Sequence, residues 1–557
     1  MSIEATTERP VKSQEGGADE SETGSTPERF KVVVPDRVSE EGLEILTSDS
    51  RFEVVQAAGW EEDELFGALQ DAHAVIVRSS TKVTEEFLDR SPHLRVIGRA
   101  GVGVDNIDIQ AATARGIPVL NAPAGNTVSA AELTFALLLS AVRGISSADR
   151  SVRAGAWERS RFKGMELRGK TLGLVGAGRI GGEVARRARA FEMKVVAVDP
   201  YLSEERASEL GVEMTSLEEI LKTADVISLH TPLTATTRGM IGEEELQTIK
   251  PTAYLLNVAR GGLVDEAVLA KALEEGWIAG AALDVYENEP LEEGSPLREA
   301  PNLVLTPHLG ASTLEAQDLV ASEICTGVRA ALVEGDLSRA LNAPKIGGET
   351  LRRLRPLLRL SEQVGRLACA LSRGGIKSVE VRYAGEGEDG LVPVSSAVLT
   401  GLLTEILGDD QVNFVNAQHL TESRGIEVTT STVSRQADYS EFVEVRLGAE
   451  QGDVRISGAL LGSRHPRIVQ IDEFKIDMVP EGSMLVLWNR DVPGVIGKVG
   501  NLLGSLDLNI AGYHQARLGP GGQALAAVSV DGEITPEVVA TLREIDEVTD
   551  VRVAELD

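Results

Sequence analysis

The chain has 557 residues, of which 42% are apolar, 4% aromatic and 25% charged. Its 86 acidic and 55 basic residues give a net charge of -31, which argues against a nucleic-acid or anionic-membrane partner because such partners need a basic surface. No apolar run reaches the roughly 20 residues of a membrane span, and the 2 cysteines can form neither a disulfide framework nor a C-x-x-C metal site. The composition predicts an acidic protein of a reducing compartment, with room for three or four domains at roughly 150 residues each.

Residues 1–29 consist mainly of Ser, Thr, Glu and Gly and predict a disordered tail. The segment has no apolar stretch and is rich in Glu, so it has the features of neither a secretion signal nor an organellar transit peptide. We therefore expect a cytoplasmic protein.

From residue 31 on, short apolar strands alternate with helical segments, which is typical of βαβ units and a mostly parallel sheet. The first series has expected strands at 31–35, 52–55, 74–77, 94–98 and 118–121, with helices at 40–47, 61–69 and 84–88. A long apolar helix at 129–143 leads to a second series, with expected strands at 171–175, 194–198, 226–229, 253–258, 279–285 and 303–305. Two consecutive α/β units are therefore expected within residues 30–343.

The alternation of strands and helices ends near residue 343. A helical segment at 349–373 precedes short Val- and Thr-rich strands, glycine turns and charged stretches that run to about residue 480. The last residues read β-α-β-β-α-β, at 484–488, 495–506, 510–518, 524–530, 536–544 and 548–553. That order predicts a ferredoxin-like module.

A glycine-rich loop joins the first strand of the second unit to a helix. The pattern G-x-G-x-x-G falls at Gly176, Gly178 and Gly181, where glycines permit a tight turn and let backbone amides approach a pyrophosphate. Asp199 follows at the end of the next predicted strand, where a carboxylate binds both ribose hydroxyls of adenosine and repels a 2′-phosphate. The pattern predicts NAD rather than NADP as cofactor, with a helix cap as the alternative for Asp199.

Three further groups indicate chemistry at strand ends in the second unit. His308 lies in a loop after a predicted strand, and imidazole suits a base that takes a hydroxyl proton near pH 7. Asp284 and Glu289 lie upstream, and the residues alone leave open which of them holds the imidazole and favours its charged form. Arg260 offers a planar fork for a carboxylate. Taken alone, His308 would be interpreted as a histidine with a structural role in a loop, and Arg260 as part of a surface salt bridge. Taken together, these residues predict a site that oxidises a hydroxy acid.

Four motifs in this order resemble the signatures of the D-isomer-specific 2-hydroxyacid dehydrogenases. They are VGAGRIG from Val175, NVARGG from Asn257, DVYENEP from Asp284 and TPHLGAST from Thr306. Over residues 30–557 the chain resembles the long-form D-3-phosphoglycerate dehydrogenases within that family. The resemblance implies oxidation of 3-phospho-D-glycerate to 3-phosphohydroxypyruvate with NAD, the entry step of L-serine biosynthesis.

The resemblance also implies roles for individual residues. Arg260 binds the substrate's carboxylate and carbonyl, Glu289 charges the imidazole, and His308 transfers the proton as hydride passes to the nicotinamide, which Asp284 would face. The residues placed around NAD are Gly176, Gly178, Arg179, Ile180, Gly181, Asp199, Thr231, Val258, Ala259, Arg260, Asp284, His308, Gly310 and Ala311.

The substrate phosphate requires cations, since a dianion in a cleft must be neutralised. Arg78, Arg99 and Asn126 match the family's substrate pocket, and Arg159 matches a position that reaches across a dimer interface. Without the resemblance, these arginines read as solvated surface groups. Val102 departs from relatives that carry a hydroxyl near the cofactor, which puts one hydrogen bond in doubt.

The family further implies that the first domain is split around the second. Two Rossmann-like doubly wound domains are expected: a substrate-binding domain at 30–128 and 317–345, and an NAD-binding domain at 129–316. An α+β intervening domain at 346–480 and a ferredoxin-like ACT regulatory domain at 481–557 follow. Hinge closure across the cleft between the first two would exclude water from the hydride step.

The C-terminal third suggests regulation. Asp491 and Asn509 match positions that hold L-serine between paired ACT modules in regulated relatives, and a module that only assembles subunits is the alternative. Arg464, Arg467 and Lys475 are anion-contact candidates in the intervening domain, where a solvated basic patch is the blander interpretation. We expect a homo-oligomer, dimer or tetramer, with no metal.

Two other functions compete with this one. The first is a D-2-hydroxyacid dehydrogenase of another substrate, such as a glyoxylate or hydroxypyruvate reductase, although those relatives generally lack the C-terminal third. The second is an NAD sensor or scaffold without turnover, against which the presence of Arg260, Glu289 and His308 argues.

Overall fold

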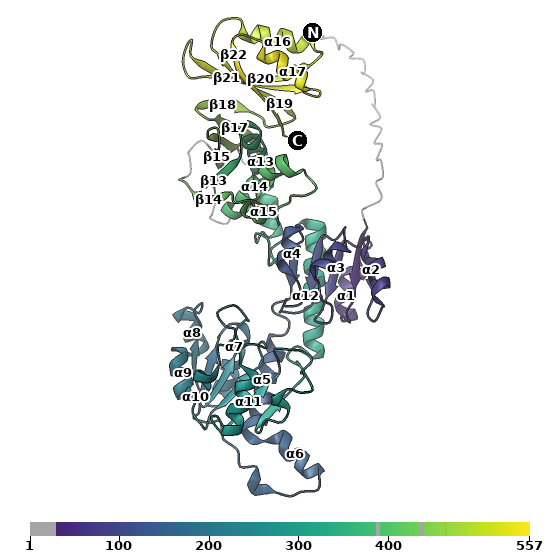
Figure 1. The fold of residues 1–557 in the computed structure, drawn as a ribbon, viewed down its shortest axis with the longest axis vertical. Helices are drawn as coiled ribbons and strands as arrows, with labels where there is room; N and C mark the ends of the chain where they lie inside the picture. Colours follow the sequence, from purple (N-terminus) through teal and green to yellow (C-terminus); the bar gives the residue numbers. More distant parts are fainter. Residues whose placement is uncertain (1–28, 386–389, 435–438, 463, 557) are drawn as a thin grey trace, which may run out of the picture.

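The structure is a computed structural model, and it describes residues 29–385, 390–434, 439–462 and 464–556. The predicted disordered tail lies, except for its last residue, outside the described residues. Four β-sheets follow one another along the chain and are stacked along the long axis of the molecule (Figure 1).

The first sheet has five parallel strands in the order β2-β1-β3-β4-β5. The strands are β1 (Phe30–Val34), β2 (Phe52–Gln56), β3 (Ala74–Val77), β4 (Val96–Arg99) and β5 (Val119–Asn121). The helices between them are α1 (Glu40–Thr47), α2 (Glu62–Leu69), α3 (Glu85–Asp89) and α4 (Ile109–Ala114). The run Ala74–Val77 is buried throughout, as expected for a strand that helices cover on both faces.

The second sheet has seven parallel strands in the order β12-β11-β10-β9-β6-β7-β8. Its strands are β6 (Thr171–Val175), β7 (Lys194–Val198), β8 (Glu213–Met214), β9 (Val226–Leu229), β10 (Tyr254–Asn257), β11 (Gly280–Leu283) and β12 (Leu303–Leu305). Its helices are α5 (Thr127–Arg143), α6 (Ile145–Arg153), η1 (Arg159–Arg161), α7 (Arg179–Ala190), α8 (Glu204–Leu210), α9 (Leu217–Thr223), α10 (Glu243–Thr248), α11 (Glu266–Glu275) and η2 (Pro296–Arg298). The strand order reverses between β6 and β9, and such a switch point is where doubly wound sheets bind ligands.

The chain passes between these two units twice. Helix α5 leaves the first sheet and packs on α7 and β11 of the second unit. Helix α12 (Leu314–Glu334) leaves the second sheet and packs on α1 and β4 of the first, with Ile324 and Val328 in the core of that unit. These two crossings are what a first domain split around the second requires.

The third sheet has six strands in the order β14-β13-β15-β16-β17-β18, and only its pair β13–β14 is parallel. Its strands are β13 (Ile376–Ala384), β14 (Glu427–Thr432), β15 (Glu441–Ala449), β16 (Val454–Leu461), β17 (His465–Ile471) and β18 (Phe474–Met478). Its helices are α13 (Gly348–Leu371), α14 (Leu391–Leu407) and α15 (Ala417–Ser423). Helices α14 and α15 lie where the sequence predicted only short strands, turns and charged stretches.

The fourth sheet has four antiparallel strands in the order β20-β21-β19-β22. Its elements are β19 (Ser483–Arg490), α16 (Val495–Ser505), β20 (Asn509–Arg517), β21 (Gln523–Asp531), α17 (Pro536–Arg543) and β22 (Val548–Glu555). The predicted ferredoxin-like order is confirmed. One face of the sheet packs on α16 and α17, and the other joins the core of the third unit, where Met484 and Leu525 lie in one cluster with Met478.

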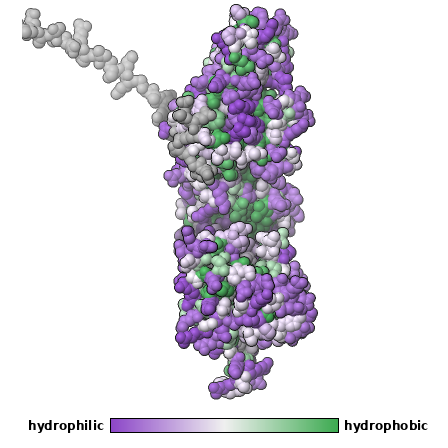
Figure 2. Space-filling model, turned by 90° about the vertical axis from the view of Figure 1, so that its left-hand side faces the viewer, coloured by the Kyte–Doolittle hydropathy of each residue, from purple (hydrophilic) through white to green (hydrophobic). Residues whose placement is uncertain are grey.

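The surface drawn in Figure 2 is mostly hydrophilic, with hydrophobic residues in scattered areas. Among the described residues, no single helix is long and apolar enough to cross a membrane, and only α5 and α6, bent by 62° at their junction, pass that test as a pair.

Candidate active site

The loop between β6 and α7 has the geometry of a phosphate site. Gly176 has φ +93°, and a Cβ there would lie 2.6 Å from the carbonyl oxygen of His230. A Cβ on Gly181 would lie 2.2 Å from the carbonyl oxygen of Gly176, so both positions exclude a side chain. A Cβ on Gly178, in contrast, would meet nothing within 4 Å. The backbone is therefore open at the start of α7, where unpaired amides and the helix dipole favour an anion such as a pyrophosphate.

The carboxylate of Asp199 is fixed beside this loop. One oxygen accepts a hydrogen bond from Ala177 N at 2.9 Å, and the other accepts from Tyr201 N at 2.9 Å. Asp199 caps no helix, since the N-cap of α8 is Ser203. Each carboxylate oxygen keeps acceptor capacity for a ribose hydroxyl, so the residues present fit NAD.

The other residues predicted to bind NAD gather at one edge of the sheet. They are Arg179 and Ile180 at the start of α7, Thr231 after β9, Val258, Ala259 and Arg260 after β10, Asp284 after β11, and His308, Gly310 and Ala311 after β12. Because all these strands are parallel, their carboxyl ends meet at the same edge, on both sides of the switch point.

His308 and Glu289 form a direct pair. Nδ1 of His308 lies 2.7 Å from Oε2 of Glu289, whose Oε1 accepts a hydrogen bond from Tyr286 N at 3.1 Å. Burial raises the pKa of the Glu289 carboxyl, but the hydrogen bond and the charge of His308 outweigh burial, so that this pKa lies below its ordinary value. Glu289 is thus an ionised partner that holds the ring by Nδ1 and leaves Nε2 for a substrate.

Asp284 anchors the loop that carries His308. Its fully buried carboxylate accepts hydrogen bonds from Thr306 Oγ1 at 2.6 Å, Leu309 N at 2.7 Å and Gly310 N at 2.9 Å. Burial raises the pKa of Asp284 above its ordinary value, although these hydrogen bonds oppose it. The choice that the sequence left open thus has a geometric answer: Glu289 touches the imidazole, and Asp284 positions the backbone around it.

A second histidine lies under the phosphate loop. Nε2 of His230 is 2.9 Å from the hydroxyl oxygen of Ser228, and burial lowers the pKa of His230 to about 4. This imidazole therefore stays neutral at physiological pH and is a poor proton carrier.

Three arginines interact where the two units face each other, the region that is called the opening here: Arg260 of the second unit pairs there with Asp105 of the first. Burial is the largest cause that lowers the pKa of Arg99, to about 10, and the charges of Arg260 and Arg78 are the next. Within the described part of the chain, Nε of Arg99 and Oδ1 of Asn126 are buried without a hydrogen-bond partner. Buried polar atoms are rarely left unpaired, so these two atoms fit contacts to a bound anion and its hydroxyl.

The backbone around Arg78 is held by residues that the sequence analysis did not single out. Asp36, just after β1, accepts hydrogen bonds from Arg78 N at 2.5 Å and from Thr81 Oγ1 at 2.9 Å. The side-chain amide of Asn106 donates to the carbonyl oxygen of Arg78 at 2.7 Å. The sequence does contain one indication of this role for Asp36: it follows the carboxyl end of a buried strand, where such folds place their ligand sites.

Other predicted residues lie elsewhere. Arg159 is exposed in η1, on the segment after α6 that projects at the far end of the second unit in Figure 1. Val102 contributes its carbonyl oxygen, which accepts from Asn121 Nδ2 at 2.7 Å. The structure therefore does not bring Arg159 to the cleft of its own chain.

The predicted effector residues do not meet within one chain. Asp491 accepts hydrogen bonds from Arg517 and Gly521, at the end of β20, whereas Asn509 begins β20 and donates to Asp531. In the intervening unit, Arg467 pairs with Asp477 at 3.2 Å, and the other two anion-contact candidates, Arg464 and Lys475, are exposed.

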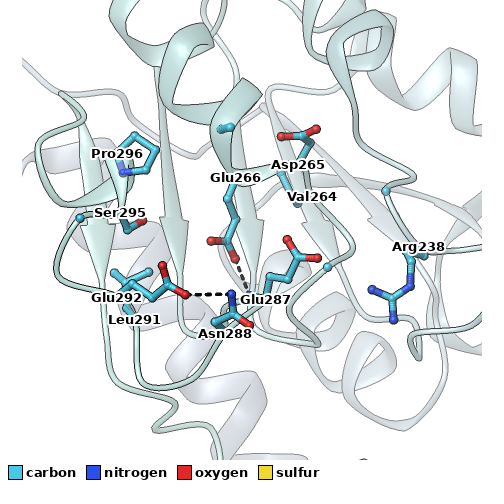
Figure 3. Close-up of a pocket in the computed structure, with 14 residues that line it drawn as sticks. Arg238, Val264, Asp265, Glu266, Glu287, Asn288, Leu291, Glu292, Ser295 and Pro296 are labelled. Carbon is cyan, nitrogen blue, oxygen red and sulfur yellow. Dashed lines mark hydrogen bonds between the residues drawn. The ribbon is translucent and has the colours of Figure 1, made fainter.

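A cavity of about 360 Å³ lies beside the segment that leads to Glu289 (Figure 3). It is acidic: Glu266 accepts a hydrogen bond from Glu287 N at 2.6 Å, and Glu292 accepts from Asn288 Nδ2 at 3.2 Å. Its lining contains neither His308 nor Arg260, so this cavity is not the candidate active site. No group of three or more metal-ligating side chains is found among the described residues.

Two family descriptions match the chain. Residues 135–310 match the NAD-binding domain of the D-isomer specific 2-hydroxyacid dehydrogenases, and residues 353–472 match the D-3-phosphoglycerate dehydrogenase intervening domain. The D-3-phosphoglycerate dehydrogenase of Archaeoglobus fulgidus is 41% identical over 95% of this chain and 100% of its own length. That of Bacillus subtilis is 39% identical over 95% of this chain and its whole length.

Solved structures resemble somewhat more than half of the chain. A protein of Thermus thermophilus is 39% identical with a TM-score of 0.51, over 54% of this chain and 97% of its own. A glyoxylate reductase from Paecilomyes thermophila is 31% identical with a TM-score of 0.51, over 56% of this chain and 98% of its own. The motifs, the site geometry and the full-length matches agree: the chain belongs to the D-isomer specific 2-hydroxyacid dehydrogenase family, in the branch that carries the D-3-phosphoglycerate dehydrogenase intervening domain.

Proposed function

We propose that this protein oxidises 3-phospho-D-glycerate to 3-phosphohydroxypyruvate with NAD, the first step of L-serine biosynthesis. The observation that carries the proposal is the His308–Glu289 pair at 2.7 Å in a chain whose Arg78, Arg99 and Arg260 share one opening. Relatives that match over their whole length, intervening domain included, bear the name D-3-phosphoglycerate dehydrogenase.

The chain's residues divide the reaction between them. Arg260 binds the substrate's carboxylate, and His308 takes the proton of the 2-hydroxyl through Nε2. Glu289 keeps the ring oriented through Nδ1 and stabilises the positive charge that the ring acquires. When bound, NAD supplies the acceptor for the hydride that leaves the same carbon. In reduction each residue acts in reverse, with His308 as the proton donor.

The phosphate is assigned to the arginines of the first unit. Arg99 is at the end of β4 and Arg78 follows β3, so both reach the opening from the sheet edge that faces the second unit. A phosphate dianion would offset the mutual repulsion of the guanidinium groups, which an unphosphorylated acid does only in part.

The competing functions fit less well. The glyoxylate reductase that resembles this chain matches 98% of its own length but only 56% of this chain. A sensor without turnover has no need of an ionised carboxylate on a solvent-open imidazole, which is the arrangement of Glu289 and His308.

The test compares 3-phosphoglycerate with D-glycerate as substrates for NAD reduction. We expect the R78A and R99A variants to raise the KM of the phosphorylated acid about 10- to 100-fold each, which corresponds to the loss of one charge-assisted contact. D-glycerate turnover should change little. Arg168→Ala, which removes a surface partner of Glu192, is the matched control. No turnover of 3-phosphoglycerate, or unchanged turnover in the R78A/R99A double variant, would contradict the proposal.

Assembly and regulation form a finer part of the same proposal. Exposed apolar residues concentrate on and after α6, where Val152 is 55% and Trp157 79% exposed. Such a surface favours a second copy of the chain, which would also bring Arg159 to a partner's cleft. Asn509 begins β20, whereas Asp491 follows β19 and contacts Arg517 at the other end of β20, so an L-serine site built from both needs two ACT modules. Assays with and without L-serine test this, and the expected cytoplasmic location belongs to the same proposal.

A further inference from the structure

Arg260 has a carboxylate partner on the opposite unit. Its Nε lies 3.1 Å from Oδ2 of Asp105, in the loop between β4 and α4, and its Nη1 donates to the carbonyl oxygen of Ala259 at 2.7 Å. Arg260 follows β10 of the second sheet, so the ion pair joins the two units across the opening. Asp105 is not among the site residues predicted from the sequence.

The segment directly after Asp105 is held by contacts to the rest of the first unit. Asn106 donates two hydrogen bonds, to the carbonyl oxygens of Arg78 at 2.7 Å and Thr81 at 2.6 Å. Asp108 is the N-cap of α4, and Ile107 is buried. Asp105 thus projects from a short segment whose neighbours are fixed to the first unit.

The fit between this loop and Arg260 is close. A Cβ on Gly103 would lie 2.2 Å from Nη2 of Arg260 and 2.8 Å from Oδ2 of Asp105. Any side chain at residue 103 would therefore push the guanidinium away from the carboxylate. The guanidinium of Arg260 thus lies against the backbone at Gly103 and beside the carboxylate of Asp105.

The negative charge of Asp105 offsets part of the repulsion between the arginines. Arg260 is close enough to Arg99 for its charge to depress the pKa of Arg99, and Asp105 opposes that effect. Asp36, the other acid that opposes it, already accepts hydrogen bonds from the backbone of Arg78 and from Thr81. Without Asp105, repulsion would drive a flexible arginine side chain out of the opening.

We propose that Asp105 is a positioning residue for Arg260: its carboxylate holds Nε from across the opening, so that the remaining N–H groups on Nη1 and Nη2 meet the substrate's carboxylate. The orientation of Arg260 then depends on the approach of the two units, because the acid and the arginine belong to different ones. The inference rests on the proposed function only in so far as Arg260 binds the carboxylate of a 2-hydroxy acid.

The test measures KM and kcat for D105N and D105A, with the Kd of 3-phosphoglycerate for the protein–NADH complex determined by calorimetry. Since an exposed ion pair contributes up to about 1 kcal/mol, D105A should raise KM and Kd about fivefold, with D105N in between because Asn still accepts from Nε. The KM of NAD should stay within about twofold of the wild-type value, since the phosphate loop is untouched.

Two comparisons separate positioning from loss of structure. In an R260K background, where Nε is absent, D105N should have no further effect on KM or Kd, as a double-mutant cycle requires of residues that act through one another. Asp108→Ala removes the N-cap of α4 in the same loop, and should lower thermal stability while leaving KM unchanged.

Three results would overturn the inference: a lower KM in D105N, which would make Asp105 a competitor of the substrate; an undiminished effect in the R260K background; or the same KM change in D108A. Failure of the proposed substrate is a separate outcome, seen in the wild type. If the wild type prefers another 2-hydroxy acid, the same variants are compared with that acid. If none is turned over, the calorimetric Kd decides.

Discussion

Glu289 and His308 form the pair at which the proposed proton transfer takes place, with Oε2 of the acid 2.7 Å from Nδ1 of the ring. Both Asp284 and Glu289 precede His308 in the chain, and sequence distance gives no reason to prefer one. The fold resolves it, because three hydrogen-bond donors of the His308 loop surround the Asp284 carboxylate, whereas Glu289 Oε2 reaches Nδ1 of the ring.

Substitution of Glu289 by Gln should lower the rate of oxidation. The pKa of Glu289 lies below its ordinary 4.5, because the hydrogen bond and charge of His308 oppose the effect of burial, so its carboxylate is ionised at neutral pH. The contribution of the ionised carboxylate is therefore fully present above pH 4.5 and is lost as the pH falls through the lowered pKa. In E289Q the positive charge that the ring acquires on taking the proton has no counter-charge, so kcat should fall about tenfold or more at neutral pH.

This prediction is checked by kcat/KM for oxidation between pH 5 and 10. Glu287→Gln is the control, because Glu287 is exposed and only its backbone amide is bonded, to Glu266. An unchanged kcat in E289Q would show that Glu289 does not act on the proton-transfer step.

Asp105 and Asp36 show the limit of prediction at this scale. Neither was predicted as a site residue, because their roles arise from neighbours that are distant in sequence: Arg260 for Asp105, and the Arg78–Thr81 turn for Asp36. Such long-range contacts do not follow from the residues next to either acid in the chain.

Among the elements, the loops that follow the parallel strands decide the chemistry. The loop after β12 changes direction at His308, which has φ +54°, and Asp284 at the end of β11 holds it by two backbone amides and one hydroxyl. Strand pairing β11–β12 brings the acid and the loop together. The sequence predicted the strands but not this bond between their ends.

Asp284→Asn should loosen that loop. An amide side chain has one acceptor oxygen, so one of the two amides at Leu309 and Gly310 loses its partner, and the imidazole loses its fixed position. We expect kcat to fall at least about tenfold, since small misplacements of a catalytic group cost this much or more. Hydrogen exchange at residues 309–310 should become faster. If exchange is unchanged and only the KM of NAD rises, Asp284 is a cofactor contact and not an anchor.

Helix α14 shows the opposite case, an element that the sequence did not reveal. Residues 391–407 are nearly all apolar or small, and most of them are buried, including Val394, Val398 and Leu402. A helix that is buried on most sides has no polar stripe, so the 3.6-residue period that identifies surface helices is missing.

For the whole molecule, the sequence predicted four units, but the last two share a core. Gln363, in the middle of α13, donates hydrogen bonds from Nε2 to the carbonyl oxygens of Pro480 at 2.6 Å and Leu556 at 3.1 Å. One buried amide thus ties the helix of the intervening unit to both ends of the ferredoxin-like module.

Gln363→Met should weaken this connection while leaving the active site intact. The two carbonyl groups would be buried without a donor, at a cost of about 2–4 kcal/mol in the free energy of unfolding of the C-terminal units. Calorimetry should show an earlier transition with unchanged turnover of 3-phosphoglycerate. Gln451→Met, at an exposed turn of the same unit, is the control and should leave the transition in place. Equal midpoints in both variants would mean that Gln363 does not couple the units.

The net charge of the molecule differs in sign from the local charge at the proposed substrate site. A net charge of -31 excludes polyanionic partners, yet the proposed substrate and cofactor are anions. The opening between the first two units resolves this, because positive charge gathers there: burial, and next the charges of Arg260 and Arg78, lower the pKa of Arg99 to about 10.

The sequence by itself predicted the order of elements in the two α/β units and in the ferredoxin-like module, the phosphate loop with Asp199, the family and the candidate catalytic groups. These properties are local: strand and helix periods, turn glycines and short motifs need only neighbouring residues. The tertiary structure decided which acid touches His308, that α12 returns to the first sheet, that the last two units share a core, and that Asp105 reaches Arg260. These are contacts between residues far apart in the chain, and they exist only because packing of the apolar strands and helices brings their polar ends together.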